Sequence, residues 1–150
     1  MPSRAATSPA SKRSPRKQAR LRLNAIKEVS VDKTASGLGH LRIVLSDKAY
    51  IGPGRADLLE GIAATGSISA AGKAMGMSYK RAWSLVQALN EGFGRPLVDT
   101  VRGGAGQGGA QLTALGQEVL ARYRAMQVAT EAAIAADVAA LRAAISDISE

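Results

Sequence analysis

The sequence lacks cysteine altogether and contains a single histidine, His40. Without cysteine the chain has no disulfide framework, and no thiolate is present to hold a metal ion or to act as a nucleophile. One histidine excludes most zinc sites and any relay between histidines. Aromatic residues make up only 3% of the chain, although the 46% of apolar residues suffices for a core. The composition argues against an enzyme, and we expect no metal and no cofactor.

Long hydrophobic runs are missing as well. The N-terminus has no apolar segment of the kind that a secretory signal contains, and no run of about 18 uncharged apolar residues occurs. Glu131, Asp137 and Arg142 interrupt the alanine-rich C-terminal stretch. An arginine- and serine-rich start also fits an organelle transit peptide, but no amphipathic apolar face accompanies the charge. We therefore expect a cytoplasmic, nucleoid-associated bacterial protein rather than a membrane protein.

Negative charge is absent from the first 27 residues. The basic residues of this segment are Arg4, Lys12, Arg13, Arg16, Lys17, Arg20, Arg22 and Lys27. From Glu28 onward basic and acidic residues cancel, so the net charge of +8 belongs to the N-terminal segment. Its composition predicts that residues 1–36 form a disordered arm. Basic tails commonly bind polyanions, nucleic acid first, although a solubilising arm is an equal alternative.

The next part of the chain predicts a strand, a turn and a helix. The β-branched run at 41–46 predicts a short strand, and "GPG" at 52–54 predicts a turn after it. A helix follows, and Gly66 is placed to end it as a C-terminal glycine cap. The apolar face of this helix comprises Leu58, Leu59, Ile62 and Ala63.

Two further helices are predicted, with a tight turn at Gly76 between them. Ser67 can cap the first of them, which runs to about residue 75, and Ser78 can cap the second, which runs to about residue 91. Glycine is placed to end the second at 92–94. Its three- and four-residue spacing joins Ala82, Leu85, Val86, Leu89 and Phe93 on one face.

The last part of the chain predicts a hairpin and a long helix. "LVDTVR" at 97–102 and "AQLT" at 110–113 are short extended runs on either side of the glycine-rich stretch 103–109. Thr113 can cap a final helix that spans about 50 Å if it continues unbroken to residue 148. Its apolar positions are Leu115, Val119, Tyr123, Met126, Ile134, Val138, Leu141, Ile145 and Ile148.

The pair of short helices around Gly76 predicts a helix-turn-helix. Two helices that cross steeply need small residues at the crossing, and Ala71 and Gly72 fill that requirement. In such a motif the N-terminal face of the second helix contacts base edges and phosphates in the major groove of DNA. We expect DNA contacts from residues on these helices and from the tip of the following hairpin: Ser67, Ser69, Lys73, Ser78, Tyr79, Lys80, Arg81, Ser84, Arg102 and Gln107.

Two alternatives compete with this interpretation. The motif can be an ordinary helical hairpin with solvated basic residues, but the order helix–helix–helix–hairpin–helix favours a winged helix. The stretch 103–109 also fits the spacing G-x-G-x-x-G of a dinucleotide site. Such glycines open a helix directly, whereas "AQLT" intervenes here, and no second strand follows. A hairpin tip that approaches a sugar-phosphate backbone is the better interpretation.

Several other residues have a plain structural interpretation. His40, just before a strand, is expected at the surface, and Trp83 is expected to pack at the edge of the helices rather than on DNA. The acids Asp57, Glu60 and Asp99 form no spaced pair of the kind that acid–base catalysis uses.

The stretch "GSISAAGKAMGMSYKRAWSLVQALN", followed by the glycine-rich stretch, "LT" and a long helix, resembles the N-terminal domain of ModE-type molybdate-responsive regulators, which share a winged helix with the LysR-type family. The similarity covers about residues 41–126. It implies a mainly α fold with a small β-hairpin, a recognition helix at 78–91, a wing at 98–113 and a dimer interface on the final helix. Full-length members continue into β-barrel domains that bind molybdate. The sequence ends at Glu150, so we expect no molybdate binding.

We therefore expect three parts: an arm at 1–36, a winged helix-turn-helix at 37–114 and a dimerisation helix at 115–150. The predicted function is a sequence-specific transcriptional regulator that binds double-stranded DNA as a homodimer through residues 115–148. The alternatives are a protein-interaction module, which has no affinity for DNA, and a nucleoid-type binder without sequence preference.

Overall fold

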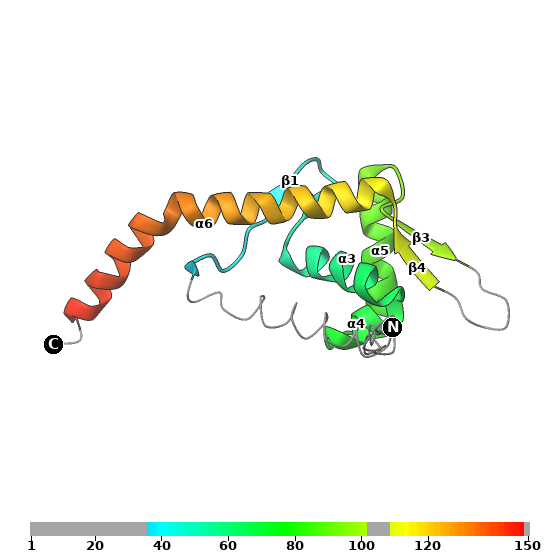
Figure 1. Ribbon diagram of the computed structural model, residues 1–150, viewed down its shortest axis with the longest axis horizontal. Helices are drawn as coiled ribbons and strands as arrows, with labels where there is room; N and C mark the ends of the chain where they lie inside the picture. The colour runs from blue at the N-terminus through cyan, green and yellow to red at the C-terminus, as the bar shows by residue number, and fades with distance from the viewer. Residues whose placement is uncertain (1–35, 102–108, 149–150) are drawn as a thin grey trace, which may run out of the picture.

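The computed structural model describes residues 36–101 and 109–148, with the side chains described as far as residue 145. The described part is mainly helical, with two small β-hairpins and a long last helix (Figure 1). The helices are α3 (Pro53–Thr65), α4 (Ile68–Ala74), α5 (Tyr79–Phe93) and α6 (Ala114–Ile148). The strands are β1 (Ile43–Val44), β2 (Tyr50–Ile51), β3 (Val98–Val101) and β4 (Gly109–Leu112). The mainly α winged helix-turn-helix with a long C-terminal helix is therefore confirmed.

The expected helix ends are mostly where the capping residues place them. Ser67 and Ser78 are N-caps whose hydroxyls accept from the amides of residues 70 and 81 at 3.1 and 3.2 Å. Gly66 and Gly94 end α3 and α5 in the left-handed conformation, which glycine adopts without a steric penalty. The hydroxyl of Thr113 accepts from the amide of Gly116 at 3.0 Å at the start of α6.

Two expectations in the first part of the chain were wrong. The turn at 52–54 is absent, because Gly52 is the extended N-cap of α3 and Pro53 begins the helix. Proline is well suited to a first helical position, where its missing N–H would have no intrahelical acceptor. The strand expected at 41–46 shortens to β1, and it pairs antiparallel with β2, which sequence reasoning missed. Two-residue strands are too short to leave a periodic signal.

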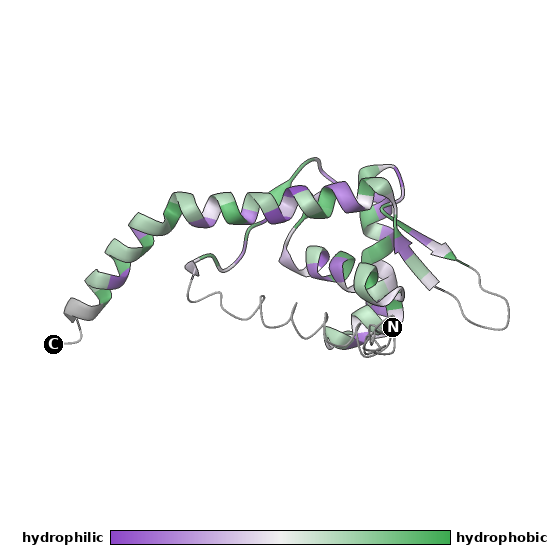
Figure 2. Cartoon of the chain, viewed as in Figure 1, coloured by the Kyte–Doolittle hydropathy of each residue, from purple (hydrophilic) through white to green (hydrophobic). Residues whose placement is uncertain are grey.

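One core joins α3, α4, α5 and the inner faces of both hairpins. Helix α3 lies at its centre and packs against every other helix of the described chain. Buried hydrophobic residues of these elements form the core, and hydrophobic residues also occur along the distal half of α6, which extends away from the other helices (Figure 2). The largest fully buried side chains of the described residues are those of Leu58, Leu59, Ile62, Val86, Leu89, Leu97 and Tyr123.

The crossing of α4 and α5 depends on the absence of a side chain at Gly72. A Cβ at this position would lie 2.7 Å from Cβ of Ala82 and 3.3 Å from Cγ of Met77. Ala71 and Ala82 are completely buried at the same crossing, so the small residues that the sequence indicated do bring the two helices together. Gly76 has φ of 71° in the turn between the helices, as expected for a tight turn.

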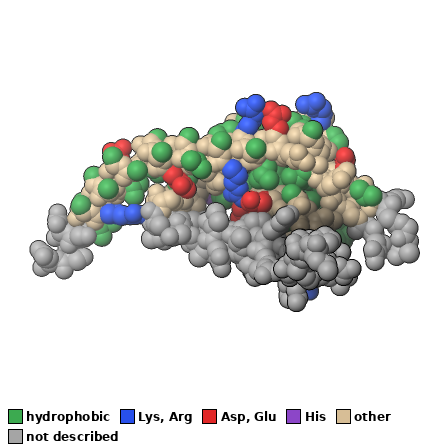
Figure 3. Space-filling view, viewed as in Figure 1, with side chains coloured by type: hydrophobic (Ala, Val, Ile, Leu, Met, Phe, Trp, Pro, Cys, Tyr) green, Lys and Arg blue, Asp and Glu red, His purple; other side chains and the backbone are tan. Residues whose placement is uncertain are grey.

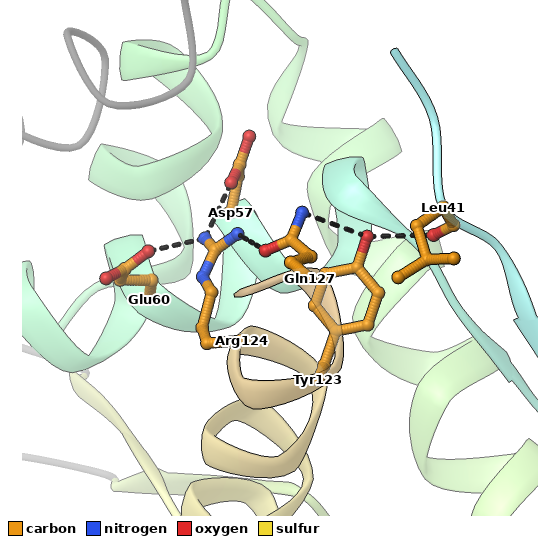
Figure 4. A network of polar contacts seen from close by, with 6 residues as sticks. All are labelled: Leu41, Asp57, Glu60, Tyr123, Arg124 and Gln127. Atoms are coloured by element: carbon orange, nitrogen blue, oxygen red, sulfur yellow. Dashed lines mark hydrogen bonds and ion pairs between the residues drawn. The ribbon is translucent and has the colours of Figure 1, made fainter. Parts of the chain in front are cut away.

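A polar network attaches α6 to α3 and to the segment before β1 (Figure 4). Arg124 donates to Asp57 at 2.7 Å and to Glu60 at 2.5 Å, and to Gln127 at 2.9 Å. Basic and acidic side chains meet below α6 in the space-filling view (Figure 3). Burial lowers the pKa of Arg124. Its hydrogen bonds to the two carboxylates and the charges of those carboxylates together raise the pKa by more than burial lowers it. The net shift is therefore upward, and the guanidinium stays charged.

The same network continues through the buried ring of Tyr123. Its hydroxyl donates to the carbonyl oxygen of Leu41 at 2.8 Å and accepts from Nε2 of Gln127 at 3.3 Å. Burial is the main reason why the pKa of Tyr123 is raised above 10.0; the charge of Arg124 lowers it less, and the charge of Asp57 adds to the rise. The raised pKa of Tyr123 means that the folded state favours the neutral phenol.

Tyr123→Phe should lower the free energy of unfolding by about 1 kcal/mol at neutral pH, because the carbonyl oxygen of Leu41 loses its donor. The folded-state pKa of Tyr123 is raised above its unfolded value, so its stabilising effect is complete below pH 10 and is lost as the pH rises through the folded-state pKa. The difference in free energy of unfolding between the wild type and Tyr123→Phe, measured by urea unfolding, should therefore become smaller above pH 10. Tyr79→Phe, at a ring that is 59% exposed, is the matched control and should change nothing.

Gly72→Ala should destabilise the protein by about 1–3 kcal/mol, because the new methyl group overlaps Ala82 at the helix crossing. Gly54→Ala provides the control. Gly54 also lies in a helix, but a Cβ there meets nothing within 4 Å, and alanine is the better helix former. Equal midpoints of urea unfolding for the two variants would contradict a steric role for Gly72.

Candidate nucleic-acid interface

Helix α5 buries one face and exposes the other. Ala82, Val86 and Leu89 enter the core, while Lys80 and Arg81 lie in the first turn with their side chains exposed. This division follows from the spacing of the apolar residues, which recur at three and four positions. The exposed side of the N-terminal half of α5 is therefore available to a partner that approaches along the α4–α5 turn.

The expected contact residues of the helix-turn-helix divide into capping and free side chains. Ser67 and Ser78 use their hydroxyls as helix caps, and the hydroxyl of Ser84 donates to the carbonyl oxygen of Lys80 at 2.9 Å. Ser69 and Lys73 are exposed on α4, four residues apart and hence on one face of that helix. The serines thus shape the backbone at the start of each helix, and the cations supply free charge.

Positive charge on this surface has no internal partner. In the described part of the chain, the ion pairs involve Arg122 and Arg124, and none of them includes Lys73, Lys80 or Arg81. Three exposed cations on two adjoining helices leave their charge to solvent or to an anionic ligand. We define the recognition surface as Ser69, Lys73, Tyr79, Lys80 and Arg81.

Tyr79 and Trp83 form an aromatic pair on α5 that sequence reasoning did not identify. The ring centroids lie 6.1 Å apart with an interplanar angle of 70°, an edge-to-face contact. Trp83 is half-buried and packs against the core, as expected, and its Nε1 is enclosed without an acceptor. The i, i+4 spacing was the available signal for this contact. The contact with the half-buried Trp83 thus supports the exposed ring of Tyr79.

The hairpin of β3 and β4 is attached directly to α5. Val98 pairs with Leu112 and Val101 with Gly109, and the two strands run antiparallel. Asn90 on α5 accepts from the amide of Leu97 at 2.8 Å and donates to the carbonyl oxygen of Val98 at 3.3 Å. These bonds fix the base of the wing relative to α5, and sequence reasoning missed them because Asn90 carries no periodic signal.

The tip of the wing lies outside the described residues, and so do Arg102 and Gln107. The strands on either side of it form a hairpin with each other, and Gly109 belongs to β4. This pairing differs from the strand–loop–helix arrangement of a dinucleotide site. The arm at 1–35 also lies outside the described part of the chain.

The described residues contain neither a cluster of three or more potential metal ligands nor a helix apolar enough to cross a membrane. Asp57 and Glu60, which had suggested no function, both bind Arg124. His40 is exposed, as expected, beside Gly52.

Comparison with known proteins matches the same part of the chain. Residues 55–117 match the family described as bacterial regulatory helix-turn-helix protein, lysR family. The molybdenum-pterin-binding protein MopB of Rhodobacter capsulatus is 46% identical over 79 residues, which are 53% of this chain and 29% of MopB. The molybdenum transport protein ModE of Azotobacter vinelandii is 41% identical over 80 residues, 53% of this chain and 30% of that protein. The DNA-binding transcriptional dual regulator ModE of Escherichia coli K12 is 41% identical over 83 residues, 55% of this chain and 32% of that protein.

The chain spans about a third of the length of these relatives. The matched region includes most of α3 and all of α4 and α5, and the last two carry the recognition surface. The matched family consists of regulatory DNA-binding proteins rather than enzymes. The segment at 55–117 is therefore similar to the helix-turn-helix domain of the lysR family and to the corresponding part of these ModE proteins.

Proposed function

We propose that this chain is a transcriptional regulator that binds duplex DNA through the recognition surface. The observation that carries the proposal is the set of exposed cations on α4 and α5 that no described acid neutralises. Of these cations, Lys80 and Arg81 lie in the N-terminal half of α5, which is the part of a recognition helix that reaches base edges. The similarity of residues 55–117 to regulatory helix-turn-helix proteins supports the same assignment.

Sequence preference is proposed to come from Arg81 and Lys80. Arginine and lysine donors suit the O6 and N7 acceptors of guanine in the major groove. Ser69 and Lys73 on α4, with Arg102 and Gln107 on the wing, are assigned to phosphate and sugar, which position a protein without selecting sequence. Tyr79 presents an exposed ring that suits a thymine methyl group.

A second copy of the chain is proposed to complete the DNA-binding unit. The distal seam of α6, which we define as Ile134, Val138, Leu141 and Ile145, lies on one side of the helix at steps of four and three. Ile134 and Val138 are half-buried. Gly37 packs on Val138, since a Cβ added at Gly37 would lie 2.6 Å from Cγ1 of Val138. Leu141 is 67% exposed and Ile145 is 66% exposed. A partner helix would cover this outer part of the seam.

The division into an arm at 1–36, a winged helix at 37–114 and a dimerisation helix at 115–150 remains part of the proposal. Binding to double-stranded DNA would distinguish a regulator from a protein-docking module. A single sequence motif shared by the bound DNA sites would distinguish a regulator from a nucleoid-type binder. The absence of molybdate binding by this 150-residue chain also stays a prediction. Calorimetry that detects micromolar binding of molybdate would contradict it.

Arg81→Ala should weaken binding to the preferred duplex by about 1–3 kcal/mol and reduce the difference between that duplex and a scrambled one. The amide of Arg81, which the cap at Ser78 uses, is retained in the variant. Arg122→Ala is the charge-matched control, because Arg122 lies on α6 and pairs only weakly with Glu118 at the surface. Unchanged sequence preference in Arg81→Ala, measured by fluorescence anisotropy on both duplexes, would remove the recognition-helix assignment.

Leu141→Glu should convert a homodimer into a monomer in sedimentation at micromolar concentration, because the charge falls within the distal seam. Val128→Glu is the matched control: both residues are 67% exposed, but Val128 lies about 100° from the seam at 100° per residue. The dimer should read two half-sites about 34 Å apart, or a multiple of that. A point substitution is preferable to truncation after Met126, which would also remove Gln127 from the network around Tyr123. A wild-type chain that sediments as a monomer would refute the dimer.

A further inference from the structure

Two arginines, Arg42 just before β1 and Arg55 on α3, hold the ring of Tyr50 between them. Cζ of Arg42 lies 3.8 Å and Cζ of Arg55 lies 3.6 Å from the centre of the Tyr50 ring. Two guanidinium groups at these distances would overlap on a single face of the ring, so they occupy opposite faces. Cation–π contacts of this kind fix the direction of otherwise flexible arginine side chains.

The positive charge of this cluster is unbalanced. Among the described residues, neither Arg42 nor Arg55 takes part in an ion pair. Nη1 of Arg55 donates to the carbonyl oxygen of Tyr50 at 3.3 Å, whereas its Nε is enclosed and has no acceptor. Two fixed cations on either side of one ring repel each other, and a bound anion would relieve that repulsion.

Apolar side chains lie next to the two arginines. Val44 pairs with Tyr50 across the hairpin, whereas Ile51, on the other face, is buried in the core. Side chains alternate along a strand, so Arg42 lies on the same outer face as Val44. Val44 is 65% exposed, and Leu45, which follows the end of β1 where this alternation no longer applies, is 56% exposed in the same hairpin. We define the hairpin surface as Arg42, Val44, Leu45, Tyr50 and Arg55.

The hairpin surface lies far from the recognition surface. The backbone at Lys48 and Ala49 packs against Gly92, where a Cβ would fall 2.5 Å from the Lys48 carbonyl oxygen. Gly92 follows Tyr79 by thirteen residues of α5, which corresponds to about 20 Å along the helix. The hairpin lies beside α6, and α4 lies on the opposite side of the molecule (Figure 1). Both surfaces can therefore be occupied at the same time.

We propose that the hairpin surface binds an acidic segment of another protein that also carries aliphatic side chains. Guanidinium groups fixed in position bind carboxylates with paired hydrogen bonds, and arginine and tyrosine are enriched where proteins meet. Val44 and Leu45 supply the apolar contact that a free phosphate or a DNA backbone would not use. The recognition surface offers no comparable aliphatic pair, so the two surfaces select different partners.

The test uses the full chain and a fluorescein-labelled octapeptide, Glu-Glu-Leu-Glu-Glu-Leu-Glu-Glu, with its all-Gln counterpart as a control. Arg42→Gln combined with Arg55→Gln should weaken binding of the Glu peptide about fivefold, since each exposed ion pair contributes modestly. Lys80→Gln combined with Arg81→Gln removes the same charge from α5. It should leave peptide affinity unchanged and weaken binding to DNA. Because both double variants retain the basic N-terminal segment, its contribution cancels in the comparison.

A second readout locates the bound peptide. In nitrogen–proton NMR spectra the peptide should shift the amide signals of Val44 and Leu45 and the Nε–H signal of Arg55, and duplex DNA should not. Val44→Ser changes no core contact and should also weaken peptide binding, which covers the case in which the double arginine variant fails to fold. Equal loss in the two double variants, equal binding of the Gln peptide, or hairpin shifts caused by DNA would each overturn the proposal.

Discussion

The fold depends on one close contact, the approach of α4 to α5 at Gly72. No side chain larger than hydrogen fits there, because Ala82 and Met77 occupy the space that a Cβ would need. The contact sets the position of α5 relative to α4, and thereby the direction in which Lys80 and Arg81 point. The backbone of α5 in turn carries Asn90, which fixes the base of the wing. A steric constraint inside the core thus determines the geometry of a polar surface outside it.

The long helix is held by a different kind of interaction. Arg124 joins α6 to two carboxylates of α3, and Tyr123 joins it to the backbone before β1. These bonds hold the proximal part of α6 in place. The distal seam extends beyond them, away from the other helices (Figure 1). Tyr123→Phe tests only the attachment of the proximal part of α6, whereas Leu141→Glu tests only the distal seam. The same helix can therefore be separated experimentally into an anchored part and an assembly part.

Local signals in the sequence predicted the elements that local chemistry determines. Serine caps, glycine ends and three- and four-residue spacing indicated α4, α5 and the start of α6, and the structure confirms them. The network around Arg124 could not be predicted, because Asp57 and Arg124 are 67 positions apart and neither belongs to a motif. The same holds for the β1–β2 hairpin, in which Tyr50 gains its role from two arginines on different elements. Of the candidate site, the exposed cations on α5 were predictable from spacing, whereas the i, i+4 spacing of Tyr79 and Trp83 indicates nearness but not the edge-to-face geometry of the two rings.

The distribution of charge explains how residues 28–150, which together carry no net charge, can still present distinct surfaces. From Glu28 onward the chain has as many acids as bases, so no overall field attracts DNA to this part. Among the described residues, the ion pairs join Asp57 and Glu60 of α3 and Glu118 of α6 to arginines of α6. The cations of the recognition surface and of the hairpin surface take no part in those pairs. Three of the described acids thus bind arginines of the long helix, and within the described part of the chain the cations at two separate edges form no such ion pair. An approaching anion is consequently attracted by local charge at one edge or the other, and the neighbouring side chains decide which ligand fits.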